Sequence, residues 1–321
     1  MRITLDLDAL TDQGQLTRSE AERLMALRLP DMRMGLFINI GLIFGAMAVA
    51  GGVIALVPTP VTGLTLALLA LGGGVALRIA GGANWAVLSQ ALAIMAALGL
   101  SGWIAGEYWD AEYAFWPPFA IFAITSAIAV GFRNSFLSAM AVLAFGALLG
   151  SGTVYWHASY GLFVREAFIT ITMFTLMAAG LYRARDQVSE AWQSVTTIAA
   201  RTAVIMVNFG FWVGSLWGDR VGELWATAGL EWSEASTWRN GAFVLPEELF
   251  TVGWAGALIA CMMTARRGGF LSTSALVFLC IHAYTQYFEY FGAEPETLLV
   301  GGLVAVGLAT YGGRKLAQSR I

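Results

Sequence analysis

Charged residues are scarce in this chain. Only 12% of its 321 residues are Asp, Glu, Lys or Arg, whereas 58% are hydrophobic. Soluble domains carry about 25% charged residues, so the composition excludes a water-soluble globular class. The mean hydropathy of +0.69 instead predicts a multi-pass membrane protein, whose first partner is the lipid bilayer.

Cysteine and histidine are almost missing. Cys261 and Cys280 both fall in apolar stretches, which favours small buried thiols over a disulfide framework or a metal cluster. The two histidines, His157 and His282, are too few for a polyhistidine metal site. We therefore expect neither a metal nor another cofactor.

The sequence also lacks the short motifs of common enzyme and nucleotide sites. GxSxG, HExxH, CxxC, Walker A and GxGxxG do not occur in it. Aromatic residues do not interleave with a basic run, and the net charge is −3, so nucleic acid is excluded as a partner. The acidic segment EYWDAE at 107–112 lies at the end of an apolar run, where carboxylates are ordinary solvated caps. No catalytic residue is assigned, and an enzyme that uses paired carboxylates stays an open alternative.

Long apolar runs are abundant. Each is about 20 residues long, enough to cross the hydrocarbon layer as a helix. They cover residues 35–57, 61–80, 84–106, 113–132, 134–155, 160–182, 196–217, 245–264, 269–291 and 296–313. The predicted fold class is therefore all-α, a polytopic bundle of about ten transmembrane helices.

Basic residues predict the orientation of this bundle. With both termini in the cytoplasm, all but three of the 18 Lys and Arg residues fall at or near the cytoplasmic side. The exceptions are Arg165, Arg220 and Arg239. We expect a cytosolic N-terminal segment at 1–34, a bundle at 35–313 and a cytosolic tail at 314–321. An outer loop at 218–244 should lie in the interface, with a helical stripe of apolar residues, namely Val221, Leu224, Trp225 and Ala228.

Local signals organise the N-terminal segment. DLDALTDQG predicts a short helix ended by Gly14, and Thr17 and Glu20 have capping-box spacing for a second helix that stops at Pro30. We expect a juxtamembrane helix that orients the first span. The alternative is a docking module, which would make residues 1–34 the site of a protein partner.

Glycine and proline also carry structural information. Small-xxx-small spacing, most extended at Gly210, Gly214 and Gly218, predicts close approach of helix backbones. The run at 72–74 should weaken its helix. The pair at 117–118 is expected in the first turn of its helix.

Polar residues inside the apolar runs are few. Arg165 and Glu166 are expected next to each other on one helix, inside the outer face, with Arg165 snorkelling outward. The other deep polar residues are uncharged or weakly basic: Asn39, Gln90, Thr125, Ser126, Asn208 and His282. No charge lies near the midplane, which argues against a strongly ion-coupled pump. A small neutral or amphipathic solute could still be held.

The segment HAYTQYFEYFG at 282–292 carries a polar stripe. His282, Thr285, Gln286 and Glu289 are spaced by three and four residues and so share one helix face. Lipid cannot solvate these groups, so the stripe should face other helices or water. It either lines an outward-facing site or hydrogen-bonds neighbouring helices, with Glu289 as an interfacial anchor. The candidate substrate-binding residues are His282, Thr285, Gln286, Glu289, Gln90 and Asn208.

The two ends of the chain resemble a known family. LDALTDQGQLTRSEAERL near the start, Asn84-Trp85, and QYFEYFG followed by LLVGGLVAVGLATYGGRKL at the end are similar to the uncharacterised bacterial membrane proteins of the DUF2157 family. The resemblance implies a polytopic protein of the bacterial inner membrane. It carries no catalytic residues to this chain.

Three functions are consistent with these features of the sequence. A small-solute transporter or permease is favoured because ten spans divide into five plus five, the arrangement that gives inverted repeats and a midplane site. The first alternative is a non-catalytic scaffold or accessory subunit. The second is a membrane-embedded enzyme acting on a lipid-linked substrate, with Glu289, His282, Glu107 or Glu112 as its acidic and basic groups.

Overall fold

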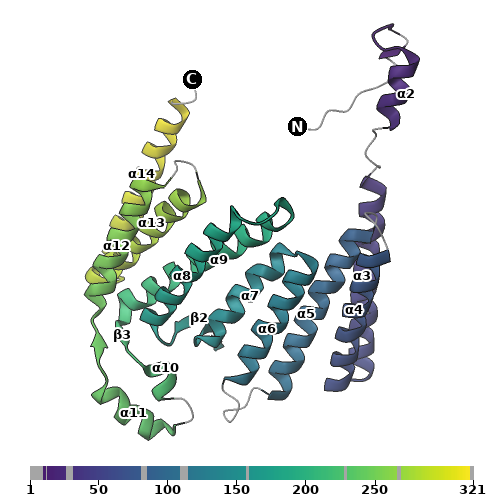
Figure 1. The fold of residues 1–321 in the computed structure, drawn as a ribbon. Coiled ribbons are helices and arrows are strands. Elements are labelled where there is room, and N and C mark those ends of the chain that lie inside the picture. The colour runs from purple at the N-terminus through teal and green to yellow at the C-terminus, as the bar shows by residue number, and fades with distance from the viewer. Residues whose placement is uncertain are drawn as a thin grey trace. The chain divides into compact units, whose positions relative to one another are not determined.

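The structure is a computed structural model that describes residues 10–11, 13–26, 32–80, 85–108, 115–156, 159–227, 230–265 and 269–318. Within these residues the protein is all-α, with thirteen helices and two small two-stranded sheets (Figure 1). The chain divides into two compact units, Met1–Ala96 and Ala97–Ile321. Each unit is described by itself.

The first unit contains α2 (Arg18–Ala26), α3 (Met32–Leu56), α4 (Pro60–Ala80) and the beginning of α5 (Ala86–Tyr108). The capping box before α2 is confirmed, because the Thr17 N–H donates to Glu20 at 2.9 Å and the Glu20 N–H donates to the Thr17 hydroxyl at 3.4 Å. Gly14 has a φ of +67°. Pro30 lies outside the described residues.

The glycine run in α4 does not interrupt the helix, which is continuous from Pro60 to Ala80. The buried hydroxyl of Ser89 on α5 donates to the carbonyl oxygen of Gly74 at 2.8 Å. The predicted weak point is therefore a place where α4 receives a hydrogen bond from its neighbour.

The second unit begins with the end of α5, followed by α6 (Trp116–Phe132) and α7 (Ser135–Leu148). Pro117 and Pro118 occupy the first turn of α6, as predicted. Arg133 adopts a left-handed conformation with a φ of 52°. Asn134 then caps α7, because its side-chain oxygen accepts from the Leu137 N–H at 2.9 Å.

A hairpin follows α7, and it corrects two of the predicted spans. The run at 134–155 ends as a helix at Leu148, and β1 (Ser151–Trp156) pairs antiparallel with β2 (Ser159–Val164). The run at 160–182 becomes helical only at Ala167, where α8 (Ala167–Arg185) begins. Hydropathy alone cannot separate strand from helix in such a run, whereas the β-branched and aromatic residues here favour a strand. Gly150, with a φ of +74°, makes the turn between α7 and β1.

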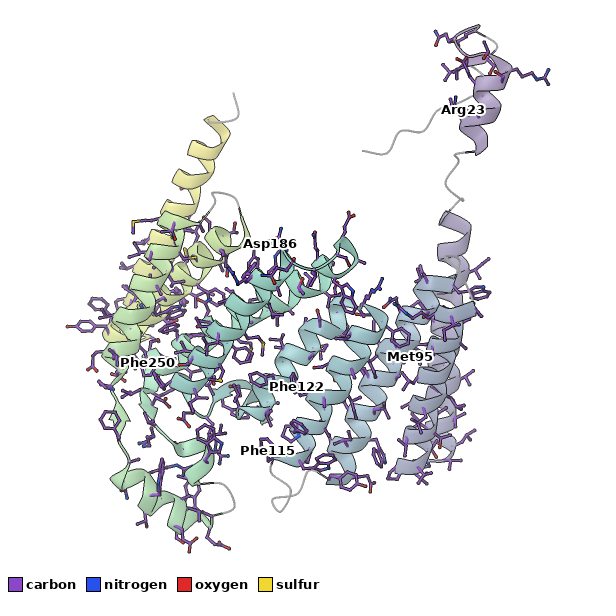
Figure 2. The ribbon with its side chains drawn as sticks, in the orientation of Figure 1. Arg23, Met95, Phe115, Phe122, Asp186 and Phe250 are labelled. Carbon is purple, nitrogen blue, oxygen red and sulfur yellow. The ribbon has the colours of Figure 1, made fainter. Side chains whose placement is uncertain are left out.

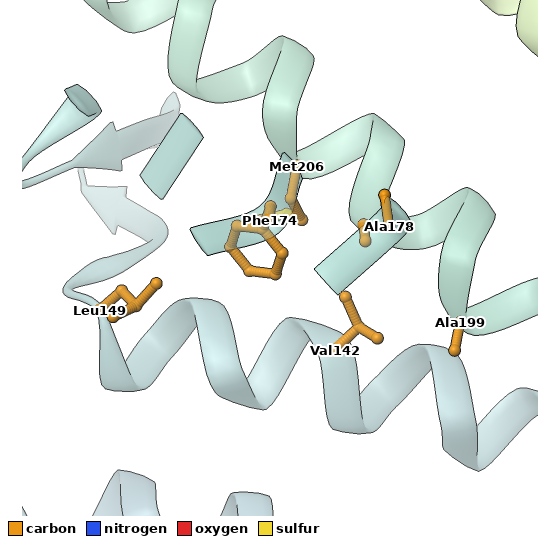
Figure 3. Packing of buried hydrophobic residues seen from close by; sticks show 7 residues of the cluster. Val142, Leu149, Phe174, Ala178, Ala199 and Met206 are labelled. Carbon is orange, nitrogen blue, oxygen red and sulfur yellow. The ribbon is translucent and has the colours of Figure 1, made fainter. Parts of the chain in front are cut away.

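Helices α7, α8 and α9 (Glu190–Trp217) pack together beside this hairpin (Figure 1). The buried side chains between them are Val142, Leu149, Phe174, Ala178, Ala199, Ala203 and Met206 (Figure 3). Two glycines permit the close packing. A Cβ at Gly146 would lie 2.9 Å from Met206 Cε, and a Cβ at Gly210 would lie 2.8 Å from Ile171 Cγ1.

The segment between α9 and α12 contains β3 (Asp219–Arg220), α10 (Glu223–Ala226), α11 (Trp232–Gly241) and β4 (Val244–Leu245). The strands β3 and β4 pair antiparallel. The predicted apolar stripe is wrong, because α10 has only four residues and cannot carry it. Leu224 packs against the α7–α8–α9 core, whereas Val221 and Trp225 are exposed. Ala228 lies outside the described residues.

Three further helices complete the unit: α12 (Glu247–Thr264), α13 (Phe270–Phe291) and α14 (Pro295–Gln318) (Figure 1). Helix α12 packs on both α9 and α13. The Tyr287 hydroxyl on α13 donates to the Thr297 carbonyl oxygen of α14 at 3.1 Å. Helix α14 continues into the segment predicted as a cytosolic tail.

Each of the ten predicted apolar runs overlaps one of these longer helices. By length and composition, four helices of the described chain could cross a membrane: Pro60–Ala80, Ala86–Tyr108, Ala167–Arg185 and Glu190–Trp217. Four further apolar helices there are shorter, at Ile40–Leu56, Trp116–Phe132, Ser135–Leu148 and Pro295–Gly307. Several long apolar helices are compatible with a membrane protein, and the count of ten spans stays a prediction.

Candidate functional site

The candidate site lies where α9, α12 and α13 meet. Its apolar base consists of Trp254, Leu258, Ala275 and Phe278, all buried. Gly214 on α9 allows the approach of α12, because a Cβ there would lie 2.7 Å from the ring of Phe250. Phe250 is labelled in Figure 2, on the first turn of α12. The glycine ridge predicted on α9 therefore forms this part of the interface.

Trp254 links α12 to α9 through a buried hydrogen bond. Its indole N–H donates to the side-chain oxygen of Asn208 at 2.9 Å, and the Asn208 amide donates to the Val204 carbonyl oxygen at 2.8 Å. Trp254 is 1% exposed and Asn208 is 6% exposed. Both ends of the Asn208 amide are thus occupied by protein groups, as a buried amide requires.

His282 packs against the ring of Trp254. The two rings are 4.5 Å apart between centroids and tilted by 55°. A hydrogen bond joins the imidazole to the backbone of Thr251 on α12. The ring is buried, and in the described part of the chain its Nδ1 atom has no hydrogen-bond partner.

A second buried polar atom without a partner belongs to Trp212 on α9. Its ring packs against the same apolar base, and its indole Nε1 is buried with no acceptor among the described residues. Burying a polar group without a hydrogen bond costs roughly 1–3 kcal/mol in proteins. The cluster therefore holds one unsatisfied nitrogen on α9 and one on α13.

Toward the end of α13 the polar contacts become weaker and more exposed. The Ser215 carbonyl oxygen on α9 accepts from the Gln286 amide and from the Thr251 hydroxyl, each at 3.4 Å. Thr285 donates to the Ile281 carbonyl oxygen of its own helix at 2.8 Å. Glu289 is exposed. The predicted stripe thus runs from a buried histidine to an exposed carboxylate.

The structure brings together part of the predicted set. His282 and Asn208 both contact Trp254, and Gln286 lies on the same helix as His282. Gln90 lies half-buried on α5, in the first compact unit. Trp254 and Trp212 were not predicted. Their residue type is the signal that could have indicated them, since a tryptophan buried inside an apolar run needs a hydrogen-bond acceptor for its N–H.

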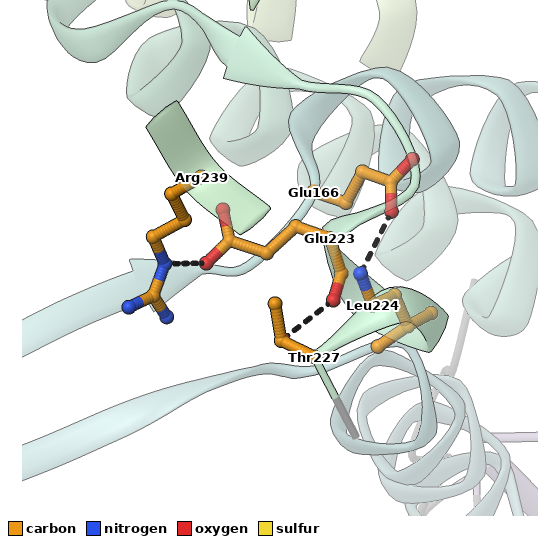
Figure 4. Close-up of polar contacts among 5 residues, drawn as sticks. All are labelled: Glu166, Glu223, Leu224, Thr227 and Arg239. Carbon is orange, nitrogen blue, oxygen red and sulfur yellow. Dashed lines mark hydrogen bonds and ion pairs between the residues drawn. The ribbon is translucent and has the colours of Figure 1, made fainter. Parts of the chain in front are cut away.

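A separate group of carboxylates lies beside α8 and α10. Glu166 is 0% exposed, and its two carboxylate oxygens accept from the N–H groups of Gly222 at 2.9 Å and Leu224 at 3.1 Å. Figure 4 shows the bond from Leu224. This position corrects the expectation that Arg165 and Glu166 share a helix, because α8 begins only at Ala167. Arg165 is exposed. Glu166 therefore holds the start of α10 through two backbone hydrogen bonds.

Asp219 makes the reciprocal contact. It is 6% exposed, and its carboxylate accepts from the Phe168 N–H in the first turn of α8 at 2.8 Å. Burial raises the pKa of Asp219, and the nearby Glu166 adds to that rise while backbone hydrogen bonds oppose it. Nearby, Arg239 forms an ion pair with Glu223 at 2.8 Å (Figure 4). These carboxylates join α8, α9 and the α10–α11 segment.

The acidic residues proposed for an enzyme are less organised. Glu107 is exposed near the end of α5, and Glu112 lies outside the described residues. No group of three or more His, Cys, Asp or Glu side chains in the described ranges could hold a metal ion. The described geometry does not single out a reaction centre.

Comparisons of the chain with protein-family models, with curated proteins and with solved structures found no match. The similarity to the DUF2157 family therefore stays a prediction. Any functional assignment has to come from the described side chains and from the sequence.

Proposed function

We propose that the protein is a multi-pass membrane protein that transports a small neutral or amphipathic solute, bound in the α9–α12–α13 cluster. The observation that carries this proposal is the pair of buried nitrogens without partners, His282 Nδ1 and Trp212 Nε1. An imidazole nitrogen accepts or donates a proton according to tautomer, whereas an indole N–H only donates. A solute with at least one acceptor would satisfy the indole, and a hydroxyl could also satisfy the imidazole.

The aromatic surroundings support a solute with an apolar part. The ring of Phe209 lies 6.2 Å from that of Trp212 between centroids, and the ring of Trp254 lies 4.5 Å from that of His282. Phe278 contacts both Phe209 and Trp254. Apolar walls with a few placed polar groups are typical of small-molecule sites. The polar groups named at this cluster are an amide, two indoles and an imidazole, from Asn208, Trp212, Trp254 and His282, which favours a solute without a strong charge.

The outer surface of the helices supports the membrane part of the proposal. Large apolar side chains are exposed along them, for example Leu56 at 83%, Ile79 at 81% and Met263 at 75%. Such surfaces are unfavourable in water and favourable against lipid. With the basic residues as a guide, we propose ten spans with both termini in the cytoplasm, in the bacterial inner membrane that the family resemblance implies.

The experiment starts from the unidentified solute. Small molecules would be profiled in a deletion strain and in the same strain overproducing the full chain, and a solute that changes in opposite directions would be the candidate. His282→Gln and Trp212→Phe should then abolish the difference, because each removes or alters one unsatisfied nitrogen. Tyr284→Phe is the matched control, since Tyr284 is an exposed residue of the same helix.

Purified variants should also keep the thermal stability of the wild type. Loss of the solute difference in stable His282→Gln and Trp212→Phe, with the control unchanged, would support the site. A solute difference that persists in both variants would exclude the cluster, and an unchanged profile in deletion and overproducer would exclude transport.

One observation favours the scaffold alternative. The α10–α11 segment carries strongly exposed tryptophans, Trp225 at 63% and Trp232 at 79%. Exposed aromatic residues are typical of protein interfaces and of membrane interfaces. Co-purification of a defined partner that is lost when both tryptophans are replaced by Ser would favour an accessory subunit.

A further inference from the structure

A cationic cluster lies at the opposite end of the same helices, away from the proposed solute site. Arg201 projects from α9, and its guanidinium carbon lies 5.0 Å from the ring centre of Phe270, the first residue of α13. The hydroxyl of Tyr182 on α8 hydrogen-bonds with the Arg201 side chain. Three helices therefore converge on one guanidinium group.

No carboxylate of the described residues forms an ion pair with Arg201. Its Nε atom is buried without a hydrogen-bond partner, and the only ion pair among the described residues joins Arg239 to Glu223. Asp186 and Glu190 follow in the α8–α9 connection, but both are exposed. A partly buried cation without a counter-charge is unfavourable. An external anion would complete this environment.

Neighbouring groups add to the positive potential. Arg183 and Arg185 occupy the last turn of α8, and Arg185 is close enough to act electrostatically on Tyr182. Helix α13 begins beside Arg201 without a side-chain cap, so the partial positive charge of its N-terminus is not offset there by a capping group. A guanidinium with free N–H groups matches the geometry of phosphate oxygens.

Exposed apolar side chains on adjacent helices indicate where this anion comes from. Met263 near the end of α12 is 75% exposed, and Leu276 and Val277 on α13 are 50% and 52% exposed. They would contact acyl chains while the phosphate lies at Arg201. In the proposed topology this end faces the cytoplasm, where basic pockets between spans bind anionic headgroups.

We propose that Arg201, Tyr182 and the start of α13 form a binding site for the phosphate group of an anionic membrane lipid. The site differs from the solute site in place and in chemistry, because it selects a negative charge. It would fix the inner ends of α8, α9 and α13 relative to one another.

The experiment compares lipids on the purified full chain. The protein in nanodiscs of phosphatidylcholine is compared with the protein in nanodiscs that also contain phosphatidylglycerol, by thermal unfolding and by native mass spectrometry of retained lipid. We expect phosphatidylglycerol to raise the melting temperature and to be retained in preference to phosphatidylcholine. In Arg201→Gln the preference should fall about fivefold to tenfold, as expected for the loss of one basic group near the membrane surface.

Arg220→Gln is the matched control, because Arg220 is an exposed arginine just beyond the other end of α9. It should keep the full preference. If Arg201→Gln does not fold, the wild type alone still decides, since a wild type without preference for phosphatidylglycerol would overturn the proposal. Tyr182→Phe should weaken the preference without abolishing it.

Soluble anions separate the two sources of phosphate. Inorganic phosphate and glycerol 3-phosphate are added to the protein in neutral nanodiscs. Stabilisation by either one equal to that by phosphatidylglycerol would overturn the lipid assignment in favour of a soluble phosphate ligand. An undiminished lipid preference in Arg201→Gln would overturn the site itself.

Discussion

Replacing Gly214 by Ala should destabilise the α9–α12 interface. The added Cβ would lie 2.7 Å from both Cγ and Cδ1 of Phe250 and 3.1 Å from Cε1. Carbon atoms pack best at about 3.5–4.0 Å, so the ring or the helix has to move. Phe250 is only 4% exposed, which leaves the ring little room to turn away. The contact is thus a true overpacking of a rigid aromatic side chain.

Two opposing contributions determine how much Gly214→Ala changes the free energy of unfolding. Overpacking a buried site costs about 1–3 kcal/mol, whereas Gly→Ala within a helix gains about 0.8–1 kcal/mol of helix propensity. Gly256→Ala on α12 is the matched control, because a Cβ there would meet no described atom within 4 Å. The control carries only the propensity gain. The difference between the variants should therefore equal the packing cost, about 1–3 kcal/mol.

Thermal unfolding of the purified chain in one detergent, at one scan rate, measures this difference. In domains of roughly 150–250 residues, 1 kcal/mol shifts the melting temperature by about 2–4 °C. Gly214→Ala should melt several degrees below Gly256→Ala. Phe250→Leu, which is narrower, should recover part of the loss in the Gly214→Ala background, because residues in contact are not additive.

Equal stability of the two glycine variants would refute the reasoning. So would strict additivity of Gly214→Ala with Phe250→Leu. Either result would mean that α9 and α12 do not approach at this glycine.

Three further predictions concern other parts of the chain. Trp254→Phe should lower the free energy of unfolding by about 1–3 kcal/mol, because the buried Asn208 oxygen loses its donor. In an Asn208→Leu background, thermal unfolding should show a smaller loss from the same change. An equal loss in both backgrounds would contradict the hydrogen bond. The pKa of Asp219 is raised by burial, so the folded state binds that proton more tightly than the unfolded state, and the free energy of unfolding should fall as pH rises through that pKa. Asp219→Asn, which can still accept from the Phe168 N–H, should remove this fall in melting curves across the acidic range, and an identical pH dependence would contradict the assignment. A cytoplasmic reporter fused after Arg320 should be active and a periplasmic one inactive, and the reverse would overturn the proposed topology.

Local signals in the sequence predict their parts of the structure correctly. Each apolar run is helical over most of its length, the Thr17–Glu20 spacing is a capping box, and Pro117 and Pro118 occupy the first turn of α6. In each case the residues that decide the structure are neighbours along the chain.

The wrong predictions concern residues whose structure depends on distant segments of the chain. The sequence predicts Glu166 on a helix, but its hydrogen-bond partners lie 56 and 58 residues away, at the start of α10. The Asn208–Trp254 bond spans 46 residues. The hairpin at 151–164 lies where the hydropathy predicts helix, because average hydropathy does not distinguish the two periodicities. Burial and partner choice at these places depend on tertiary packing, which one sequence does not display.

The pairing of β3 with β4 has a practical consequence. Asp219 pairs with Leu245 and Arg220 with Val244, so the segment between them is closed at its base, next to the end of α9 and the start of α12. At Gly218 a Cβ would lie 2.6 Å from the Leu245 carbonyl oxygen, so the close approach of the two chain segments requires glycine at this position. A loop closed at its base isolates what is attached to it from the helices below. A reporter domain inserted after Leu230 should therefore leave the helix bundle intact, which makes this segment a suitable position for a label that tests the proposed topology.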